Sequence, residues 1–581
     1  MTRPLSPLAT ALAVAALAPL LVPAGASAHA LLLDSVPRRG AALREQPRQV
    51  VLRFSESVEA NFGALRVFDA RAERVDDGRT LHPGAGGARL AVGLRPGLPD
   101  GTYVATYRAI SADGHPVSGG LVFSVGAPGD AAAPSVSDLI GAGAAGPVTQ
   151  ALFGVARGLT YLATAIVLGA VVFLPAVWLP ALRATGATGQ EWAAAVQGFE
   201  RRTARLLLGA AAIGAVGGIA AIVLQGATAG VTSGWGALQP SVVGDVLGTR
   251  FGGVWGLRVL AFALVAVAVA VAVASRGRRR ATVALAAAPA LVIALAPALA
   301  GHASAQPPVA LLFSLDVAHV LAMSAWIGGL VLLLFALPAA TRRLDRPDRT
   351  RLLAAALLRF SPLALGCVAL LVTTGTIQAI EHVGSWDALI ASGFGRAVVV
   401  KAALLVVLAG LGAVNRRRAI PRLRELAAQA AAAGAAGHLL RRTLRAEVAL
   451  VVVVFAVTSA LVSYPPPSSY GGGPFSGSAR LGPLRIEVTA DPARVGPNEL
   501  HLYLLRASDG TPFEGTQELT LTLALPSRDI GPVSARAREA GPGHYVIDTV
   551  ALAPAGEWRL AVTSRVSEFD QYEAAIAVPV R

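Results

Sequence analysis

The sequence predicts a multidomain membrane protein: an all-β sandwich or barrel, then a bundle of about eight transmembrane helices, then a C-terminal β-sandwich. Three observations support this prediction. Of the 581 residues, 54% are hydrophobic and 15% are charged, whereas a soluble domain carries about 25% charged residues. Long apolar stretches fill the middle of the chain. Shorter alternating runs, separated by Pro and Gly, lie on both sides of them.

The basic residues are distributed as in a membrane protein. The net charge is +15 and the isoelectric point is about 11, values that are also found in nucleic-acid-binding proteins. The arginines, however, gather in short segments between apolar runs, where such residues determine membrane topology. We therefore exclude nucleic acid as a partner and expect a lipid bilayer.

The chain contains a single cysteine, Cys367. This count excludes an internal disulfide framework, a Cys-X-X-Cys redox pair, a cysteine-based zinc site and an iron–sulfur cluster. Any metal must therefore be bound by His, Asp, Glu, Met or a backbone amine.

Residues 1–28 have the pattern of a cleaved secretory signal, with a basic start, an apolar stretch at 8–22 and a small-residue site that ends at Ala28. Cleavage after Ala28 leaves His29 as the first residue. Its α-amine and imidazole can then chelate one metal ion, which an internal histidine cannot do. The alternative is that the apolar stretch is an uncleaved anchor and His29 is an ordinary linker residue.

Residues 29–127 are predicted to form a first, exported β domain. Asp113 and His115 lie in an Asp-Gly-His-Pro segment before its last strand, and residues two apart in an extended segment point to the same side. Taken alone, this segment is an ordinary turn. The strand-like runs lie at 49–54, 64–68, 102–108 and 119–125.

This segment resembles the CopC family of copper-binding proteins along its whole length. The matching residues occur in the order and spacing of that family: His29-Ala30, Val36-Pro37, Phe54-Ser55-Glu56, Gly101-Thr102-Tyr103 and Ser111 to Gly119.

The resemblance implies a Cu(II) site formed by the amine and imidazole of His29, the imidazole of His115 and the carboxylate of Asp113. Three nitrogens and one oxygen in a tetragonal arrangement suit Cu(II), which such donors also bind more tightly than competing divalent ions. Glu56 is expected to orient a ligand or a bound water rather than to bind the metal. Because the domain contains no Met, we expect no separate thioether Cu(I) site in it, and we expect His82 at the surface.

Residues 150–463 are predicted to form the transmembrane domain, after a linker at 128–149. The loops after the odd-numbered apolar stretches are rich in arginine, whereas those after the even-numbered stretches contain only Arg250 and Arg396. The positive-inside rule then places both terminal domains outside the cytoplasmic membrane of a bacterium. Each stretch is long enough, at about 20 residues, to cross a bilayer. The eight stretches are 152–180, 204–227, 253–274, 281–300, 309–337, 354–379, 396–415 and 446–463.

The fifth stretch carries Asp316, His319 and Met323 on one helix face, at spacings i, i+3 and i+7. His319 lies about ten residues from the outer end, near the middle of the membrane at ~1.5 Å per residue. Oxygen, nitrogen and sulfur donors in this order suit copper that passes from Cu(II) outside to Cu(I) within the membrane. The alternative is an Asp–His hydrogen bond that locks neighbouring helices, with Met323 filling space. His302, at the outer end of the fourth stretch, either joins this path or faces water.

Four further polar residues in the bundle are expected to be structural. Cys367 lies deep in the sixth stretch and is expected to pack as a small residue. Arg157, Arg258 and Lys401 lie near outer helix ends, from which their long side chains can extend to the interface.

The bundle resembles the CopD family of copper-resistance and copper-uptake membrane proteins. The similarity covers the second half well, and the first half only by hydropathy and at Gly301-His302. Met323 is not part of the family pattern, so its role as a ligand rests on chemistry alone. The matching residues are Asp316 to Ala322, Trp326 to Leu330, Arg359-Phe360-Ser361, Gly393 to Arg396, Lys401 and Asn415-Arg416.

Residues 464–482 are predicted to be a linker, and 483–581 a second β-sandwich that resembles YtkA-like domains. His501 and His544 are isolated in strand-like patterns and are expected to be structural. The strand-like runs lie at 484–488, 499–505, 518–525, 544–547 and 558–562.

These features predict a copper-handling fusion protein, and not an enzyme. It would bind Cu(II) outside the membrane and pass copper to the transmembrane domain for import and copper homeostasis, with extracytoplasmic copper carriers as candidate partners. The sequence has no ATP-binding motif, so a copper gradient, the membrane potential or a copper sink would drive transport. One alternative is copper sequestration and tolerance without translocation. A copper oxidase is less favoured, because the Asp113 carboxylate would occupy the position that oxygen needs.

Overall fold

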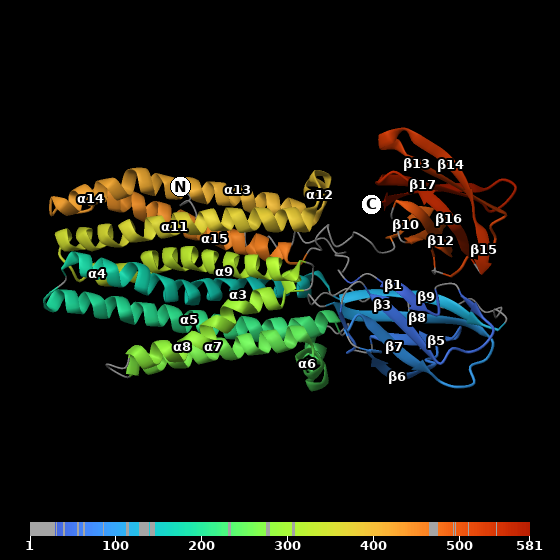
Figure 1. Ribbon diagram of the computed structural model, residues 1–581, viewed down its shortest axis with the longest axis horizontal. Helices are drawn as coiled ribbons and strands as arrows, with labels where there is room; N and C mark the ends of the chain where they lie inside the picture. Colours follow the sequence, from blue (N-terminus) through green and yellow to red (C-terminus); the bar gives the residue numbers. More distant parts are fainter. Residues whose placement is uncertain are drawn as a thin grey trace, which may run out of the picture. The chain divides into compact units, whose positions relative to one another are not determined.

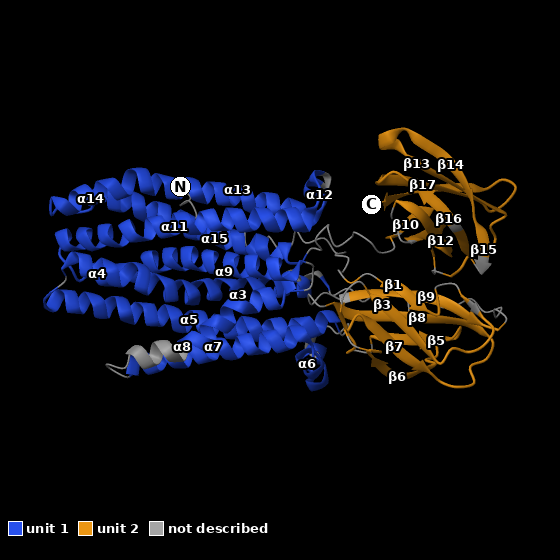
Figure 2. Cartoon of the chain, in the orientation of Figure 1, with its two compact units in different colours: residues 1–27, 144–468 blue, residues 28–143, 469–581 orange. Residues whose placement is uncertain are grey.

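The computed structural model describes most of the chain between residues 30 and 580. Its described residues divide into two compact units, shown in blue and orange in Figure 2. The first unit contains residues 144–468, and the second contains 28–143 and 469–581. Within 30–580, the residues outside the description are 31, 39–40, 55–56, 62–63, 85, 112–115, 127–138, 140–145, 187, 230–233, 275–278, 305–307, 464–474, 492, 494, 509–510 and 542.

The N-terminal β domain consists of two sheets that pack around a shared apolar core. One sheet has the order β1-β3-β7-β6, and the other has the order β2-β9-β8-β4 with β5 also paired to β8. All pairs are antiparallel except β2 with β9. Alternate residues of each strand point into the core, as in β3, where Val50, Leu52 and Phe54 are buried. The strands are β1 Leu32–Val36, β2 Ala42–Leu43, β3 Gln49–Phe54, β4 Val58–Glu59, β5 Leu65–Phe68, β6 Asp76–Leu81, β7 Arg89–Leu94, β8 Gly101–Ser111 and β9 Pro116–Val125.

The second unit also contains the C-terminal β domain, which has a separate apolar core. A sheet of order β10-β11-β12-β16-β15 packs on one of order β14-β13-β17-β18, and the described pairs are all antiparallel. This sandwich agrees with the predicted fold class. Its strands are β10 Phe475–Leu481, β11 Leu484–Asp491, β12 Gly496–Arg506, β13 Glu518–Leu525, β14 Ile530–Arg536, β15 Arg538–Gly541, β16 His544–Leu552, β17 Gly556–Arg565 and β18 Gln571–Val580.

The first unit is a bundle of long helices (Figure 1). Short helices connect or extend the long ones: η3 Gly234–Leu238, α6 Pro240–Leu247, η4 His302–Ser304 and α12 Trp386–Ala391. The long helices, with the π-helical turns inside them, are α3 Pro147–Phe173 with η2 Leu174–Trp178 and α4 Leu179–Thr185; α5 Gln190–Ala229; α7 Arg250–Ala274; α8 Arg279–Leu299; α9 Val309–Val331 with η5 Leu332–Ala336 and α10 Leu337–Thr341; α11 Arg346–Val383; α13 Gly393–Val414 with η6 Asn415–Ala419 and α14 Ile420–Ala428; and α15 Gly434–Leu461.

Among the described residues, seven of these helices are long and apolar enough to cross a membrane. The predicted fourth span corresponds to α8, whose described apolar part, Ala286–Leu299, is shorter. The helices also continue beyond the apolar stretches. Arg201 and Arg202 lie inside α5, and Arg416 to Arg418 lie inside η6, so these predicted loops are helical. Arg, Ala and Leu are strong helix formers, so α5 begins before its apolar stretch and the helix that contains η6 continues past its own.

Three helices change to π winding immediately before a Leu-Pro or Ile-Pro pair. A proline has no N–H and its ring crowds the carbonyl four residues earlier, which disfavours regular α winding, although α11 continues through Pro362. The π turn shifts the preceding N–H to the carbonyl five residues back, which keeps the backbone bonded inside the bundle. The shifted bonds run from the N–H groups of Leu179, Leu337 and Ile420 to the carbonyls of Leu174, Leu332 and Asn415.

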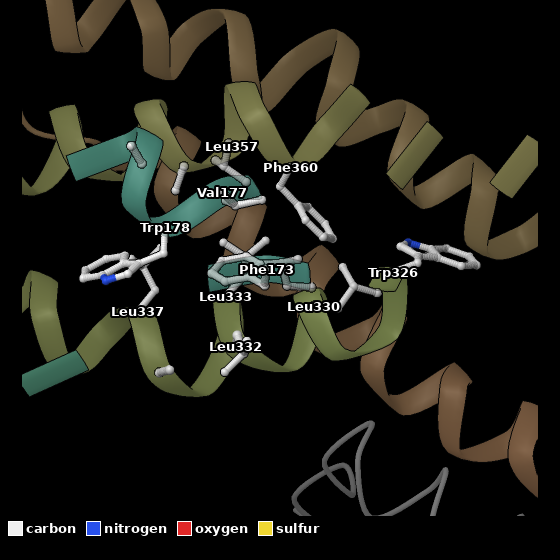
Figure 3. Close-up of a cluster of buried hydrophobic side chains, with 14 of the residues drawn as sticks. Phe173, Val177, Trp178, Trp326, Leu330, Leu332, Leu333, Leu337, Leu357 and Phe360 are labelled. Carbon is white, nitrogen blue, oxygen red and sulfur yellow. The ribbon is translucent and has the colours of Figure 1, made fainter. Parts of the chain in front are cut away.

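The core of the bundle forms where α3, α9 and α11 meet (Figure 3). Phe173 of α3 lies against Phe360 of α11, with ring centroids 6.2 Å apart. Trp178 in η2 stacks on Phe199 of α5 at 3.6 Å. The leucines of α9 and η5 that Figure 3 labels, among them Leu330 and Leu333, fill the space beside these rings.

Two glycines allow α3 and α9 to approach closely. A Cβ on Gly169 would lie 2.5 Å from the Cα of Gly328, and a Cβ on Gly328 would lie 2.7 Å from the Cα of Gly169 and still closer to the carbonyl oxygen of Ala165. Small residues at such crossings let membrane helices pack backbone against backbone.

We predict that Gly328→Ala destabilises the bundle by about 1–3 kcal/mol, because the new methyl group overpacks the α3–α9 crossing. Gly366→Ala in α11 is the matched control. A Cβ there meets no atom within 4 Å, so we expect equal or slightly higher stability. Thermal unfolding of the detergent-solubilised protein measures both effects, and equal melting temperatures for the two variants would contradict the role of this crossing.

Candidate functional site

The four predicted residues of the N-terminal copper site lie outside the described residues. They are His29, Glu56, Asp113 and His115. The strand ends that flank them are described, and these ends show where the segments attach.

Those strand ends lie together at one end of the N-terminal domain. Leu32 at the start of β1 pairs with Phe54 at the end of β3, and Val58 in β4 pairs with Ser111 at the end of β8. The two pairs are adjacent, because the N–H groups of Phe54 and Val58 donate to the neighbouring carbonyls of Ala88 (2.8 Å) and Gly87 (3.0 Å).

This arrangement sets the reach of the segments that carry the predicted ligands. His29 is three residues before Leu32, a separation that spans at most about 10 Å. Asp113 and His115 belong to the connection from Ser111 to Pro116, the first residue of β9. All the segments that carry predicted ligands therefore start from the same end of the domain.

In the helical unit, the polar face of α9 meets α11. The Nδ1 atom of His319 lies 2.9 Å from the hydroxyl oxygen of Thr374, and that hydroxyl donates to the carbonyl of Leu370 at 2.7 Å. With its proton used in this way, the Thr374 oxygen must accept from Nδ1–H of His319. The lone pair of the imidazole is then on Nε2. Metal-binding histidines are commonly held by such a bond from their other nitrogen.

Asp316 lies one turn before His319 and also contacts α11. The Nε2 atom of Gln378 donates to its carboxylate over 3.5 Å. Lys401 of α13 interacts electrostatically with both Asp316 and His319, and Tyr161 of α3 interacts with Asp316. The structure thus brings Asp316 and His319 together with polar groups from three other helices.

The remaining predicted path residues are placed differently. Met323 is partly buried and packs against two apolar clusters, which is the environment expected of a space-filling side chain. Cys367 is buried in the larger of these clusters. His302 begins η4, and its side chain lies outside the description. Among the described residues, no group of three or more His, Cys, Asp or Glu side chains could hold a metal ion.

Two arginines expected to extend to the interface are instead buried. Arg258 is 2% exposed and donates to the hydroxyl of Thr164 at 2.8 Å, and its guanidinium lies 5.1 Å from the ring centroid of Trp255. Arg157 is 5% exposed and lies over the ring of Phe153. Cation–π contacts and hydrogen bonds to hydroxyls stabilise these guanidinium groups inside the bundle, so the side chains need not reach water.

Sequence reasoning missed the partners of the predicted residues, Thr374 and Gln378. Both were detectable as polar residues four apart, which places them on one face of the part of the helix that follows the apolar stretch 362–372.

Comparison with known proteins assigns three parts of the chain to families. Residues 32–126 match the CopC domain, residues 148–311 match the N-terminal domain of copper resistance protein D-like proteins, and residues 354–461 match copper resistance protein D. Asp316 and His319 fall between the last two matches. The similarity of residues 483–581 to YtkA-like domains stays a prediction.

The chain is also similar to individual proteins. The chain is 28% identical over 566 residues to the copper transport protein CutJ of Bacillus subtilis (strain 168), which covers 95% of each chain. It is 30% identical over 106 residues to copper resistance protein C of Escherichia coli, which covers 17% of this chain and 83% of that protein. The crystal structure of CopC from Methylosinus trichosporium OB3b matches at 28% identity over 17% of this chain and 93% of that chain, with a TM-score of 0.16.

We predict that Thr374→Val destabilises the protein by about 1–3 kcal/mol, because Nδ1–H of His319 loses its acceptor inside the bundle. The matched control is Thr373→Val. That hydroxyl donates to the carbonyl of Ala369 on an exposed part of the helix, so its loss should have little effect. Thermal unfolding compares the variants, and the nitrogen chemical shifts of labelled histidine report the tautomer. An unchanged tautomer and equal stability would contradict this role of Thr374.

Proposed function

Because this chain joins a CopC domain to the two parts of a copper resistance protein D, we propose that it captures Cu(II) outside the cytoplasmic membrane and passes copper inward through its helical unit. The observation that carries this proposal is the His319–Thr374 pair. It leaves the imidazole lone pair on Nε2 of a part-buried histidine, in the same chain as a CopC-type domain.

The capture step uses the N-terminal domain. After cleavage following Ala28, the amine and imidazole of His29, the imidazole of His115 and the carboxylate of Asp113 supply three nitrogens and one oxygen to Cu(II). Glu56 orients one of these ligands or a bound water. The adjacent ends of β1, β3, β4 and β8 support this site, because every segment that carries a predicted ligand is attached at this one end of the domain.

The passage step uses the polar face of α9. His319 is ten residues from Val309, or about 15 Å along the helix, which is half of the ~30 Å hydrocarbon core. A cation bound at its Nε2 atom would be stabilised by the carboxylate of Asp316, while Lys401 balances that carboxylate when no cation is bound. Met323 is not assigned as a ligand in this step, because it packs against two apolar clusters.

The membrane potential can drive this movement. An inside-negative potential favours entry by about 2.3 kcal/mol per elementary charge for each 100 mV. The arginine-rich segments between the spans support an orientation in which both β domains are outside and copper moves toward the cytoplasm.

We predict that adding one residue before His29 of the mature full-length protein weakens Cu(II) binding by about 100-fold or more. The extension converts the α-amine into an amide, which removes one ligand. Loss of a residue that only hydrogen-bonds to a ligand already weakens metal binding by about 10- to 100-fold, so loss of a ligand should weaken it at least as much. Competition titration with a Cu(II) chelator measures the affinity. His82→Gln is the control, since this side chain donates to the Arg89 carbonyl and is not assigned to the site. An unchanged affinity in the extended protein would exclude the His29 chelate.

We predict that His319→Ala lowers the initial rate of copper uptake into proteoliposomes at least about tenfold, which corresponds to about 1.4 kcal/mol. Cu(II) binding by the N-terminal domain should not change. His438→Ala is the control, because His438 is exposed in α15. Uptake that is equal in the wild type, in His319→Ala and in protein-free liposomes would instead indicate copper sequestration without translocation.

A further inference from the structure

The C-terminal domain brings two histidines together on one sheet. In β12, Leu500 and Leu502 point into the sandwich core, so His501 points to the opposite face. In β16, Tyr545 points into the core and His544 to the opposite face. His501 pairs with Val546 and His544 with Tyr503, so the two histidines are diagonal neighbours on that face.

Their imidazoles are close and nearly coplanar. The Nδ1 atom of His501 lies 3.1 Å from the Nε2 atom of His544. The ring planes differ by 15° while the centroids are 5.3 Å apart, so the rings meet edge to edge rather than face to face. Tyr503 stacks on His544 at 4.4 Å and 5° and holds that ring in its plane. The two histidines are only 6% and 7% exposed.

Glu499 acts on the other side of the pair. Its carboxylate lies 3.4 Å from the Nε2 atom of His501, and its side chain is 48% exposed. A carboxylate at this position favours a proton on Nε2, which leaves the lone pair of Nδ1 directed at His544. This is the arrangement by which carboxylates orient metal-binding histidines.

We propose that His501 and His544 form a two-coordinate copper(I) site, with the metal between Nδ1 of His501 and Nε2 of His544. In the metal-free state, the two nitrogens share one hydrogen bond. Copper takes the place of the proton on Nε2 of His544, and His544 takes up a proton on Nδ1 from solvent, so both imidazoles stay neutral and no net proton is released. Glu499 lies at the solvent-exposed side of the pair, where its negative charge attracts the incoming cation.

The geometry favours a metal ion with linear, two-ligand coordination over an ion with four ligands. Metal–nitrogen bonds of about 2.0 Å place the two nitrogens about 4 Å apart in a linear complex. The present 3.1 Å would then have to increase by about 0.9 Å along the line of the hydrogen bond that already joins the two nitrogens. A bent or tetragonal complex would require the rings to rotate out of their common plane, against the stacking of Tyr503.

The number of ligands leads to the same conclusion. Zn(II) and Cu(II) sites usually have four ligands. In the part of the chain that the structure describes, no third His, Cys, Asp or Glu joins a metal-binding group. Copper(I), a d¹⁰ ion, accepts two imidazoles in a linear arrangement and needs no further ligand.

The test is an anaerobic titration of the full-length protein in detergent with Cu(I), against bicinchoninate as a coloured competitor. We expect His501→Gln and His544→Gln each to bind one Cu(I) fewer than the wild type. Glu499→Gln should keep the stoichiometry and weaken one site by about 10- to 100-fold. The control His82→Gln should behave as the wild type. Equal stoichiometry and affinity in all five proteins would show that the pair is only a structural hydrogen bond.

X-ray absorption on a protein with both histidines intact tests the proposal even if the glutamine variants fail to fold. The protein carries His115→Ala and His319→Ala, which remove the candidate sites of the proposed function, and is loaded with one equivalent of Cu(I). Two nitrogen scatterers and the edge feature of linear Cu(I) are expected. Sulfur, a third ligand or no bound copper would overturn the assignment. Neither experiment depends on uptake, so failure of the transport proposal would leave the result unaffected.

Discussion

The close approach of α3 and α9 at Gly169 and Gly328 is the contact on which the helical unit depends. In a bilayer, apolar side chains gain little by leaving lipid for protein, so helices associate through close packing and polar contacts. Gly328 and His319 are nine residues apart, which at 100° per residue places them on opposite sides of α9. With its small face against α3, α9 turns its polar face toward α11. Of the most apolar stretch of the span Val309–Thr341, which includes α9, 78% is buried, the largest share among the seven described spans.

This placement determines how the polar groups of the bundle are stabilised. A charged side chain in lipid costs at least about 2.5–3.5 kcal/mol, so each one needs a partner inside the protein. Thr374 and Gln378, one turn apart on α11, supply such partners to His319 and Asp316. Asp316 and His319 of α9 are thus each met by a polar residue of α11 at the same depth. A helix packed one turn out of register would break both contacts at once.

The sequence predicted many of the strands and most of the membrane-spanning helices. It did not predict which side chains contact one another across them. Alternation of apolar residues predicted β3 and β13 with their observed bounds, because both strands have one face in a core. Hydropathy located seven of the eight predicted spans as long apolar helices but gave them narrower bounds, since helix propensity extends α5 and η6 beyond the apolar stretches. His319 and Thr374 are 55 residues apart in the sequence, and they meet only because α9 packs against α11. His501 and His544 are 43 residues apart and meet only through the register of β12 and β16. Residue types alone contain no information about such registers.

Joining capture and passage in one chain changes what each site must achieve under the proposed function. A site that holds Cu(II) with a Kd of about 1 pM releases it in hours, since an association rate of about 10⁸ M⁻¹s⁻¹ implies a dissociation rate of about 10⁻⁴ s⁻¹. A tethered acceptor has an effective concentration near the millimolar range for a short flexible connection. It can therefore bind the metal before the first site has released it. This process is ligand exchange, in which the acceptor binds copper while the first site still holds it. Tight capture is compatible with fast delivery only if copper moves in this way. An acceptor in this process must present its donor atom without prior rearrangement. The hydrogen bond from His319 to Thr374 meets this requirement, because it fixes the ring and leaves Nε2 as the donor.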